Sequence, residues 1–452
     1  MAERAVEGDW KNFFIFWLGQ VVSMLGSGLT GFGLGVWVYQ RTGSVSDFTL
    51  IYVFGALPGL VLAPLMGTLV DRWDRRWALI LANFGASIST LALVILLTEN
   101  MLQLWHIYII VAIGASCISL QTPVFSATVP LLLPKKHFGR ASGMMQLGPA
   151  SSRIIAPLLA GLLMPILKLQ GLIALDLGTF VFASITLLIL KIPKVAPGPV
   201  ARVKKGLLRE AMYGWTYIKE RPGLVSLLLF FAGLNLLFAC SQVLTTPLVL
   251  SFAKPPQLGV VLSLASAGML AGSIAMSIWG GPPKRIWGIL LFSPVLGLSF
   301  LVIGLRPSVA LIGAGAFLLF FVVPIINGCD DAIWQAKVEP QVQGRVFATA
   351  QLVSTFTAPI AYLLAGPLAD RFFEPLMRPG GALAGSLGQV LGVGPGRGIA
   401  LQFGVMGLLL IAAALSGFLY PRLRSLEDEI PDAVHTAAPA AVPAAETAAV
   451  GA

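Results

Sequence analysis

The sequence predicts an all-α integral membrane protein whose twelve transmembrane helices form two six-helix bundles. Three observations predict this fold class. The 452 residues are 57% hydrophobic and only 11% charged, whereas about 25% of the residues in a typical soluble domain are charged. The apolar residues gather in stretches of about 20 or more, which is the length that crosses a bilayer as a helix. Motifs in the first half of the chain also recur in the second half.

The apolar stretches define the expected spans in order. Several are longer than a bilayer requires, which permits tilt. The first is too long for a signal peptide and lacks a cleavage site made of small residues. The three cysteines lie inside apolar stretches at no metal-like spacing, so we expect reduced packing residues and no metal site. The twelve spans are predicted at residues 13–38, 48–70, 77–97, 104–133, 141–166, 171–191, 223–252, 257–280, 286–305, 308–336, 345–370 and 399–420.

The basic residues indicate how these spans are oriented. If both termini are cytoplasmic, 22 of the 30 Lys and Arg residues lie in cytoplasmic segments, 7 lie outside, and Arg153 lies within a span. Short cytoplasmic loops are enriched in Lys and Arg. We therefore expect a multi-pass membrane protein with both termini in the cytoplasm. The net charge of +10 follows from this topology and does not indicate a nucleic-acid partner.

An internal repeat divides the chain. Three features recur 205 positions later: Gly139-Arg140, Gln146 and Leu158 correspond to Gly344-Arg345, Gln351 and Leu363. Two parallel six-span repeats are typical of a transporter whose substrate site lies between the halves. The predicted parts are a bundle at 1–192, a cytoplasmic linker at 193–222, a second bundle at 223–424 and a disordered cytoplasmic tail at 425–452. Within the linker, 205–220 has the pattern of an amphipathic helix that lies at the membrane interface. A simple basic tether and a regulatory segment are both open interpretations.

The connection between spans two and three is short and dense in charge. It runs from Gly67 to Trp77 and must turn tightly at one membrane face. It resembles the signature Gly-x-Leu-x-Asp-Arg-x-Gly-Arg-Arg of the major facilitator superfamily, although Asp74 replaces the second glycine. The resemblance implies a latch that holds the halves together on the cytoplasmic side through ion pairs and helix-end interactions. Simple anchoring of the topology is the alternative. The matching latch residues are Gly67, Asp71, Arg72, Arg75 and Arg76.

The fifth span resembles the glycine-rich antiporter motif of the same superfamily. Gly143, Pro157 and Gly161 match it, and small residues replace the other glycines, so close helix packing is retained. The chain is most similar to the branch of bacterial drug and siderophore exporters related to macrolide efflux and enterobactin export. That closer resemblance is carried by the Asn12-Phe13-Phe14 opening, the paired Gly-Arg motifs and the 220–224 segment.

Charged residues inside spans are costly, so each suggests a function. Arg153 is predicted deep in span five, either as a cation that contacts substrate and alternates between carboxylates or as an ion-pair partner of Asp176. Asp330 and Asp331 adjoin in span ten. Adjacent carboxylates in a low-dielectric setting favour a proton on one of them, which suits proton coupling. Pairing with Lys284 or Arg285 is the alternative.

Uncharged polar residues form stripes at helical spacing on spans one, four, seven and ten. In the superfamily that the chain resembles, these four spans line the central cavity. Such a lining suits a bulky amphipathic or neutral substrate, although small polar residues also serve helix packing. The predicted cavity residues are Gln20, Ser23, Ser27, Ser119, Asn235, Gln242, Asn327 and Trp334.

These features predict a secondary transporter that exports a lipophilic drug, macrolide-like compound, siderophore or natural product by alternating access. We expect a proton gradient as the driving force and no cofactor. The expected partners are the lipid bilayer and a small-molecule substrate, and the expected state is a monomer. The glycine-rich segment 392–398 lacks the Lys-Ser/Thr ending of a phosphate-binding loop. The sequence shows no His paired with Ser or Cys at catalytic spacing, so we do not expect an enzyme. A uniporter or importer of a metabolite and a non-transporting sensor are the alternatives.

Overall fold

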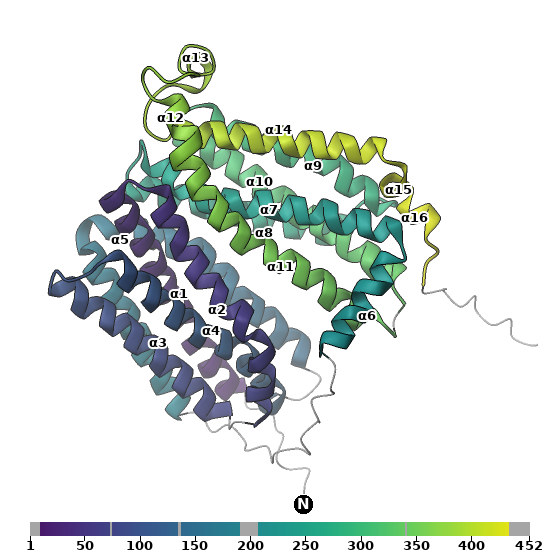
Figure 1. The fold of residues 1–452 in the computed structure, drawn as a ribbon. Coiled ribbons are helices and arrows are strands. Elements are labelled where there is room, and N and C mark those ends of the chain that lie inside the picture. Colours follow the sequence, from purple (N-terminus) through teal and green to yellow (C-terminus); the bar gives the residue numbers. More distant parts are fainter. Residues whose placement is uncertain (1–9, 73–74, 134–136, 190–206, 340, 434–452) are drawn as a thin grey trace, which may run out of the picture.

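The computed structural model describes residues 10–72, 75–133, 137–189, 207–339 and 341–433, and this part of the chain is helical without strands (Figure 1). The N-terminal half contains α1 (Trp10–Thr42), α2 (Val45–Arg72), α3 (Arg75–Thr98), α4 (Leu104–Leu132) and α5 (Phe138–Ile189). The C-terminal half contains α6 (Leu207–Lys219), α7 (Pro222–Leu250), α8 (Pro255–Trp279), α9 (Arg285–Leu305), α10 (Val309–Lys337), α11 (Gln343–Pro367), the π-helix η3 (Leu368–Phe373), α12 (Glu374–Met377), α13 (Gly388–Leu391), α14 (Arg397–Leu419), α15 (Pro421–Arg424) and α16 (Leu426–Glu429).

Eleven of the described helices are long and apolar enough to cross a membrane. Helix α5 contains two of the predicted spans. A non-helical backbone conformation at Lys168 (φ 55°, ψ −172°) divides it between them. The described helices therefore supply all twelve predicted spans. The all-α membrane fold class is confirmed.

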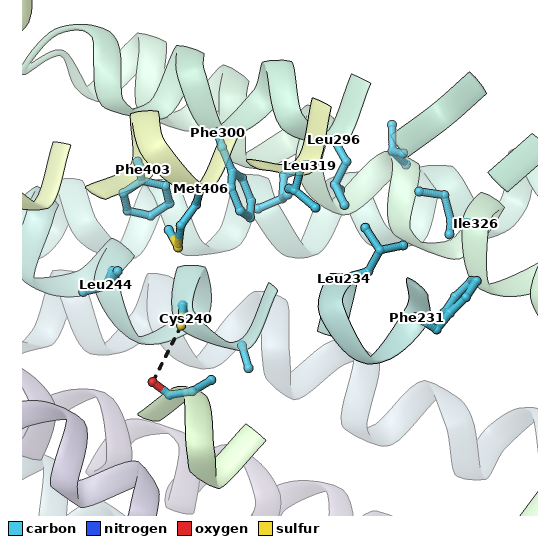
Figure 2. Packing of buried hydrophobic residues seen from close by; sticks show 14 of the residues in the cluster. Phe231, Leu234, Cys240, Leu244, Leu296, Phe300, Leu319, Ile326, Phe403 and Met406 are labelled. Carbon is cyan, nitrogen blue, oxygen red and sulfur yellow. Dashed lines mark hydrogen bonds between the residues drawn. The ribbon is translucent and has the colours of Figure 1, made fainter. Parts of the chain in front are cut away.

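One apolar core lies mainly in the C-terminal half and extends to Val36, Val45 and Phe48 of the other half, and separate clusters lie within the N-terminal half. In the C-terminal half, aromatic and aliphatic side chains of α7, α9, α10 and α14 interlock (Figure 2). The rings of Phe300 and Phe403, for example, meet edge to face with centroids 5.7 Å apart. Cys240 in the same core donates its thiol hydrogen to the Ala361 carbonyl at 3.6 Å. The three cysteines are free and at least partly buried, as expected for packing residues.

The two halves contact each other mainly through two helix pairs, α2 with α11 and α5 with α8. The contacts involve the start of α2, the end of α11, the start of α8 and residues 153–164 of α5. We call this end of the molecule, which also carries α12, the closed end. Toward the opposite end, which carries α6, α15 and α16, the two groups of helices diverge (Figure 1).

Helix α6 coincides with the predicted amphipathic helix. Gly214 packs closely against Arg345 and Thr349 of α11, and the guanidinium of Arg345 lies 5.3 Å from the centre of the Tyr213 ring. Tyr213 and Trp215 are about half exposed. The linker therefore ends in a helix that packs on the second bundle.

The segment 425–433 was predicted as the start of a disordered tail, and this is wrong. It folds back onto α9 and α10. Leu426 is fully buried, as is Leu423 just before it. Lys337, at the end of α10, is also buried, and its ammonium group donates to the Glu427 and Ile430 carbonyls at 2.6 and 2.5 Å and pairs with Asp432 at 2.8 Å. A buried ammonium group requires such partners, and their local sequence is acidic. We call 421–433 the C-terminal clasp; residues 434–452 lie outside the described part.

Candidate functional site

A buried carboxylate lies between α1 and the second span of α5. Asp176 is 1% exposed, and its Oδ1 accepts a hydrogen bond from the Ser27 hydroxyl at 3.4 Å. Thr179 donates to the Asp176 backbone carbonyl at 2.7 Å. No ion pair within 4.0 Å joins Asp176 to a cation among the described residues. The site is therefore a carboxyl group surrounded by hydroxyl groups.

The predicted ion pair of Arg153 with Asp176 is wrong. The Arg153 side chain is exposed, and its backbone carbonyl accepts a hydrogen bond at 2.9 Å from Ser266 of α8. Asp176 instead packs against Gly26 of α1. The two residues lie on either side of the interruption at Lys168 and contact different helices, so simple helical spacing did not predict their relation.

The two carboxylates of α10 have different surroundings. Asp330 is partly buried and accepts a hydrogen bond from the indole of Trp334 at 3.0 Å. Asp331 is exposed. The predicted pairing with Lys284 or Arg285 is wrong, because Lys284 instead pairs with Asp428 at 2.8 Å. The guanidinium of Arg285 donates to the Gly280 carbonyl. Lys284, which was expected to pair with the carboxylates of α10, thus pairs with the clasp.

The predicted cavity residues fall into two groups by exposure. Gln242 of α7 and Asn327 of α10 are exposed, and Asn327, Asp331 and Gln335 follow each other at four-residue spacing, so they share one face of α10. Trp334 is buried against Asp330, as a packing residue. The remaining candidates on α1, α4 and α7 are buried or partly buried: Gln20, Ser23, Ser27, Ser119 and Asn235.

The predicted latch and packing motifs have different outcomes. Gly67, Asp71 and Arg72 lie toward the end of α2, and Arg75 and Arg76 begin α3, but the side chains of 63–76 lie outside the described ones. The latch therefore remains a prediction.

Two of the three residues of the packing motif of span five lie at the contact between halves. A Cβ on Gly161 would lie 2.9 Å from the Pro255 carbonyl oxygen of α8, and one on Gly259 would lie 2.5 Å from that of Pro157. Gly143 is exposed with open space around it. Pro157 and Gly161 thus belong to the contact between halves, whereas Gly143 does not.

Sequence reasoning missed Asp370, in η3 at the end of α11. Its carboxylate accepts hydrogen bonds from the Ser44 hydroxyl, the Val45 amide and the Ser46 amide at 3.1, 3.1 and 2.8 Å. It therefore joins the C-terminal half to the first turn of α2. A signal was present: Gly366-Pro-Leu-Ala-Asp-Arg371 repeats the Gly-x-Leu-x-Asp-Arg pattern that begins at Gly67.

A second carboxylate of the same segment engages the glycine-rich 392–398 region. Glu374 accepts hydrogen bonds from the Gly396 and Gly398 amides at 2.8 and 2.9 Å. Amides at the start of a helix favour an anion, and here the chain's own side chain occupies them.

Comparison with known proteins assigns the family. The model of the Major Facilitator Superfamily matches residues 16–361. The chain is 29% identical to macrolide efflux protein A of Streptococcus pyogenes over 382 residues, covering 80% of this chain and 91% of that protein. It is 25% identical to the enterobactin exporter of Escherichia coli over 300 residues, covering 65% of this chain and 69% of that protein.

Solved structures agree on the fold. A bacterial homologue of the lysosomal transporter Spinster superposes with a TM-score of 0.68 over 93% of this chain and 98% of that chain, at 15% identity. The family match, the twelve spans and the paired bundles lead to one assignment. The chain belongs to the major facilitator superfamily, and it is a membrane transporter and not an enzyme.

Proposed function

We propose that this transporter works by alternating access and that the structure represents the state open to the cytoplasm. One observation carries the proposal: the contacts between halves gather at the closed end, while the helices diverge toward the end with α6 and the clasp. The closed end carries the loops that are poor in Lys and Arg, and short cytoplasmic loops are enriched in them. We therefore assign the closed end to the outer face of the bacterial inner membrane, with both termini cytoplasmic. We further propose that the transporter acts as a monomer.

The transport direction we propose is outward, and the proposed substrate is a lipophilic drug, macrolide-like compound, siderophore or related natural product. The names of the macrolide efflux protein and the enterobactin exporter support this class. The uncharged polar groups on α7 and α10, such as Gln242 and Asn327, suit a bulky neutral or amphipathic molecule. Import of a metabolite and sensing without transport are the alternatives.

We propose that proton entry drives export. Asp176 supports this because a buried carboxylate without a cation is unfavourable as an anion and can lower that cost by binding a proton. Asp330 and Asp331 are the second candidate pair, and Asp331 is exposed on the polar face of α10. Coupling requires a carboxyl group that exchanges protons with both sides during the cycle.

Accumulation of a fluorescent macrolide or dye in cells that express the protein tests this proposal. We expect energised cells to exclude the compound and a protonophore to abolish exclusion. Asp176→Asn should lower exclusion by a factor of about ten, because an amide cannot bind and release a proton. This factor corresponds to roughly 1.4 kcal/mol. Asp330→Asn with Asp331→Asn tests the other site. Asp428→Asn, an exposed carboxylate of the clasp, is the matched control.

Two results would oppose the proposal. If exclusion survives the protonophore, proton coupling is wrong. If purified protein binds the compound but reconstituted vesicles show no flux under a proton gradient, the sensor alternative replaces transport. Uptake that exceeds that of empty cells indicates an importer.

A further inference from the structure

We propose that Asp370 is the catch of the closed end, and that it must release the start of α2 before the transporter can open outward. The proposal rests on the alternating-access cycle proposed above. Asp370 lies outside the 67–77 loop that was predicted as the latch.

The geometry makes Asp370 a cap that crosses between halves. The first amides of a helix have no partner within the helix, and a side-chain oxygen normally satisfies them from the residue just before. In α2 the Ser44 hydroxyl accepts the Asp47 amide in this way at 3.1 Å, while the Val45 and Ser46 amides donate to Asp370, about 325 positions away in sequence. Ser44 adds its hydroxyl. The negative charge also lies favourably at the positive end of the α2 dipole.

Other contacts bring α2 and the end of α11 close enough for Asp370 to accept these hydrogen bonds. A Cβ on Gly366 would lie 2.5 Å from the Ser46 Cα, so only glycine permits this approach. One helix turn further in, the rings of Tyr52 and Tyr362 are 5.7 Å apart. Together these contacts form a continuous strip along α2 and α11.

The backbone of η3 explains how Asp370 reaches α2. Residues 368–373 form a π-helix, which has a wider turn than an α-helix and is frequent at functional sites. Asp370, within this π-helix, bonds to α2 of the other half. Glu374, directly after it, bonds to amides at the start of α14 in its own half. The two acids therefore have separate tasks.

The sequence shows that this catch has a counterpart. Gly67-Thr-Leu-Val-Asp71-Arg72 ends α2, and Gly366-Pro-Leu-Ala-Asp370-Arg371 ends the α11 segment. Since the end of α11 meets the start of α2, the helices run antiparallel. Helix α2 has 28 residues, or about 42 Å at 1.5 Å per residue. The same six-residue pattern thus lies at opposite ends of one helix pair, and the copy that contains Asp370 lies at the closed end.

Such a catch is reversible because its donors lie at a membrane face. When Asp370 separates from α2, water can hydrate the Val45 and Ser46 amides and the carboxylate. If apolar side chains closed this end instead, water could not compensate for their lost contacts when the halves separate. The catch therefore holds a state without locking it.

Spin-label distances test the proposal directly. We would replace Cys117, Cys240 and Cys329 by alanine and attach labels at Asn100→Cys and Arg378→Cys, which are exposed on the two halves near the closed end. A second pair, Arg140→Cys and Arg424→Cys, reports on the opposite end. In nanodiscs, Asp370→Asn should raise the fraction of long distances at the closed end at least threefold and shorten the distances of the second pair. A residue that only stabilises the fold would lower the melting temperature without this reciprocal change.

Matched variants make the result decisive. Asp47→Asn removes a carboxylate from the same first turn of α2 and should leave both distributions unchanged. Ser44→Ala deletes one donor to Asp370, together with the acceptor of the Asp47 amide within α2. It should produce a smaller shift in the same direction, and it keeps the test available if Asp370→Asn does not fold. Gly366→Leu should force the closed end apart by steric contact.

Two outcomes overturn the catch. One is an unchanged distribution in folded Asp370→Asn or Ser44→Ala protein. The other is opening by Gly366→Leu but not by Asp370→Asn, since packing alone would then hold the end shut. These distances do not depend on the substrate, so a failed efflux assay with shifted distances would reject the proposed function and retain the catch.

Discussion

The two helix pairs that join the halves are built in different ways. Helices α2 and α11 are joined by a carboxylate that accepts three hydrogen bonds. Helices α5 and α8 meet backbone to backbone, where Gly259 and Gly161 fit against proline carbonyls. Further along, Ser263 and Ser266 of α8 donate to the Ile154 and Arg153 carbonyls at 2.7 and 2.9 Å.

This difference separates two mechanical tasks. A carboxylate cap is directional, so its bonds break when the helix ends separate. A contact between glycines depends on close packing and not on directional bonds, so two helices can tilt against each other while staying in contact. We infer that α5 and α8 act as the pivot of the cycle and that α2 and α11 act as its catch.

The strongest way to break the pivot is to fill its closest contact. In Gly259→Leu the new Cβ would lie 2.5 Å from the Pro157 carbonyl oxygen, and backbone cannot yield easily. Overpacking of this kind costs roughly 1–3 kcal/mol or more. We expect the melting temperature in detergent to fall by about 5 °C or more, at about 2–4 °C per kcal/mol.

Gly233→Leu is the control for this variant, because Gly233 is exposed in α7 with open space around it. It should leave the melting temperature nearly unchanged. Equal melting temperatures for Gly259→Leu and Gly233→Leu would contradict the close glycine contact.

An intermediate effect is expected at the catch. In Gly366→Ala one methyl group must fit against Ser46, at a face where the halves separate during the cycle. We expect the outward-open fraction to rise by about threefold, equivalent to roughly 0.6 kcal/mol, with little change in melting temperature. A large drop in melting temperature without opening would contradict this, because the contact at Gly366 would then act through close packing, as the α5–α8 contact does.

The smallest effect on the conformation of the closed end is expected from the serines of the pivot. Ser263→Ala with Ser266→Ala removes two hydrogen bonds between helices, each worth about 0.6 kcal/mol in membrane proteins. The melting temperature should fall by about 2–4 °C, and the label distances at the closed end should not change. Ser273→Ala, whose hydroxyl bonds within its own helix, is the matched control.

The fold was predictable because the bilayer imposes a simple rule on sequence. Each span needs a long apolar stretch, and the repeat of Gly139-Arg140 at Gly344-Arg345 divides them into halves. The cores and the linker helix α6 follow from the same patterns.

The site was less predictable, because its contacts depend on register between helices distant in sequence. The ion-pair alternative placed Arg153 and Asp176 on two neighbouring spans, but the Arg153 side chain is exposed whereas Asp176 packs against Gly26 of α1, so the pair does not form. The pattern at Gly366–Arg371 was visible but went unused, since its partner is a set of backbone amides that no residue type reveals. The clasp was missed because its apolar anchors, Leu423 and Leu426, are few within a polar segment.

The C-terminal clasp has a consequence for biogenesis. Lys337 and the Glu427 carbonyl that accepts its hydrogen bond are separated by 90 positions, and the paired Asp432 carboxylate comes later still. The ribosome therefore delivers the end of α10 to the membrane long before the groups that bind its ammonium. Until then the amide of Ile286, which donates to Glu427 at 2.8 Å in the finished protein, is also unpaired. The C-terminal half therefore completes its assembly only after translation of the clasp. A reporter fused after residue 433 should be tolerated, whereas a stop codon at Pro421 should deliver the nascent transporter to membrane proteases.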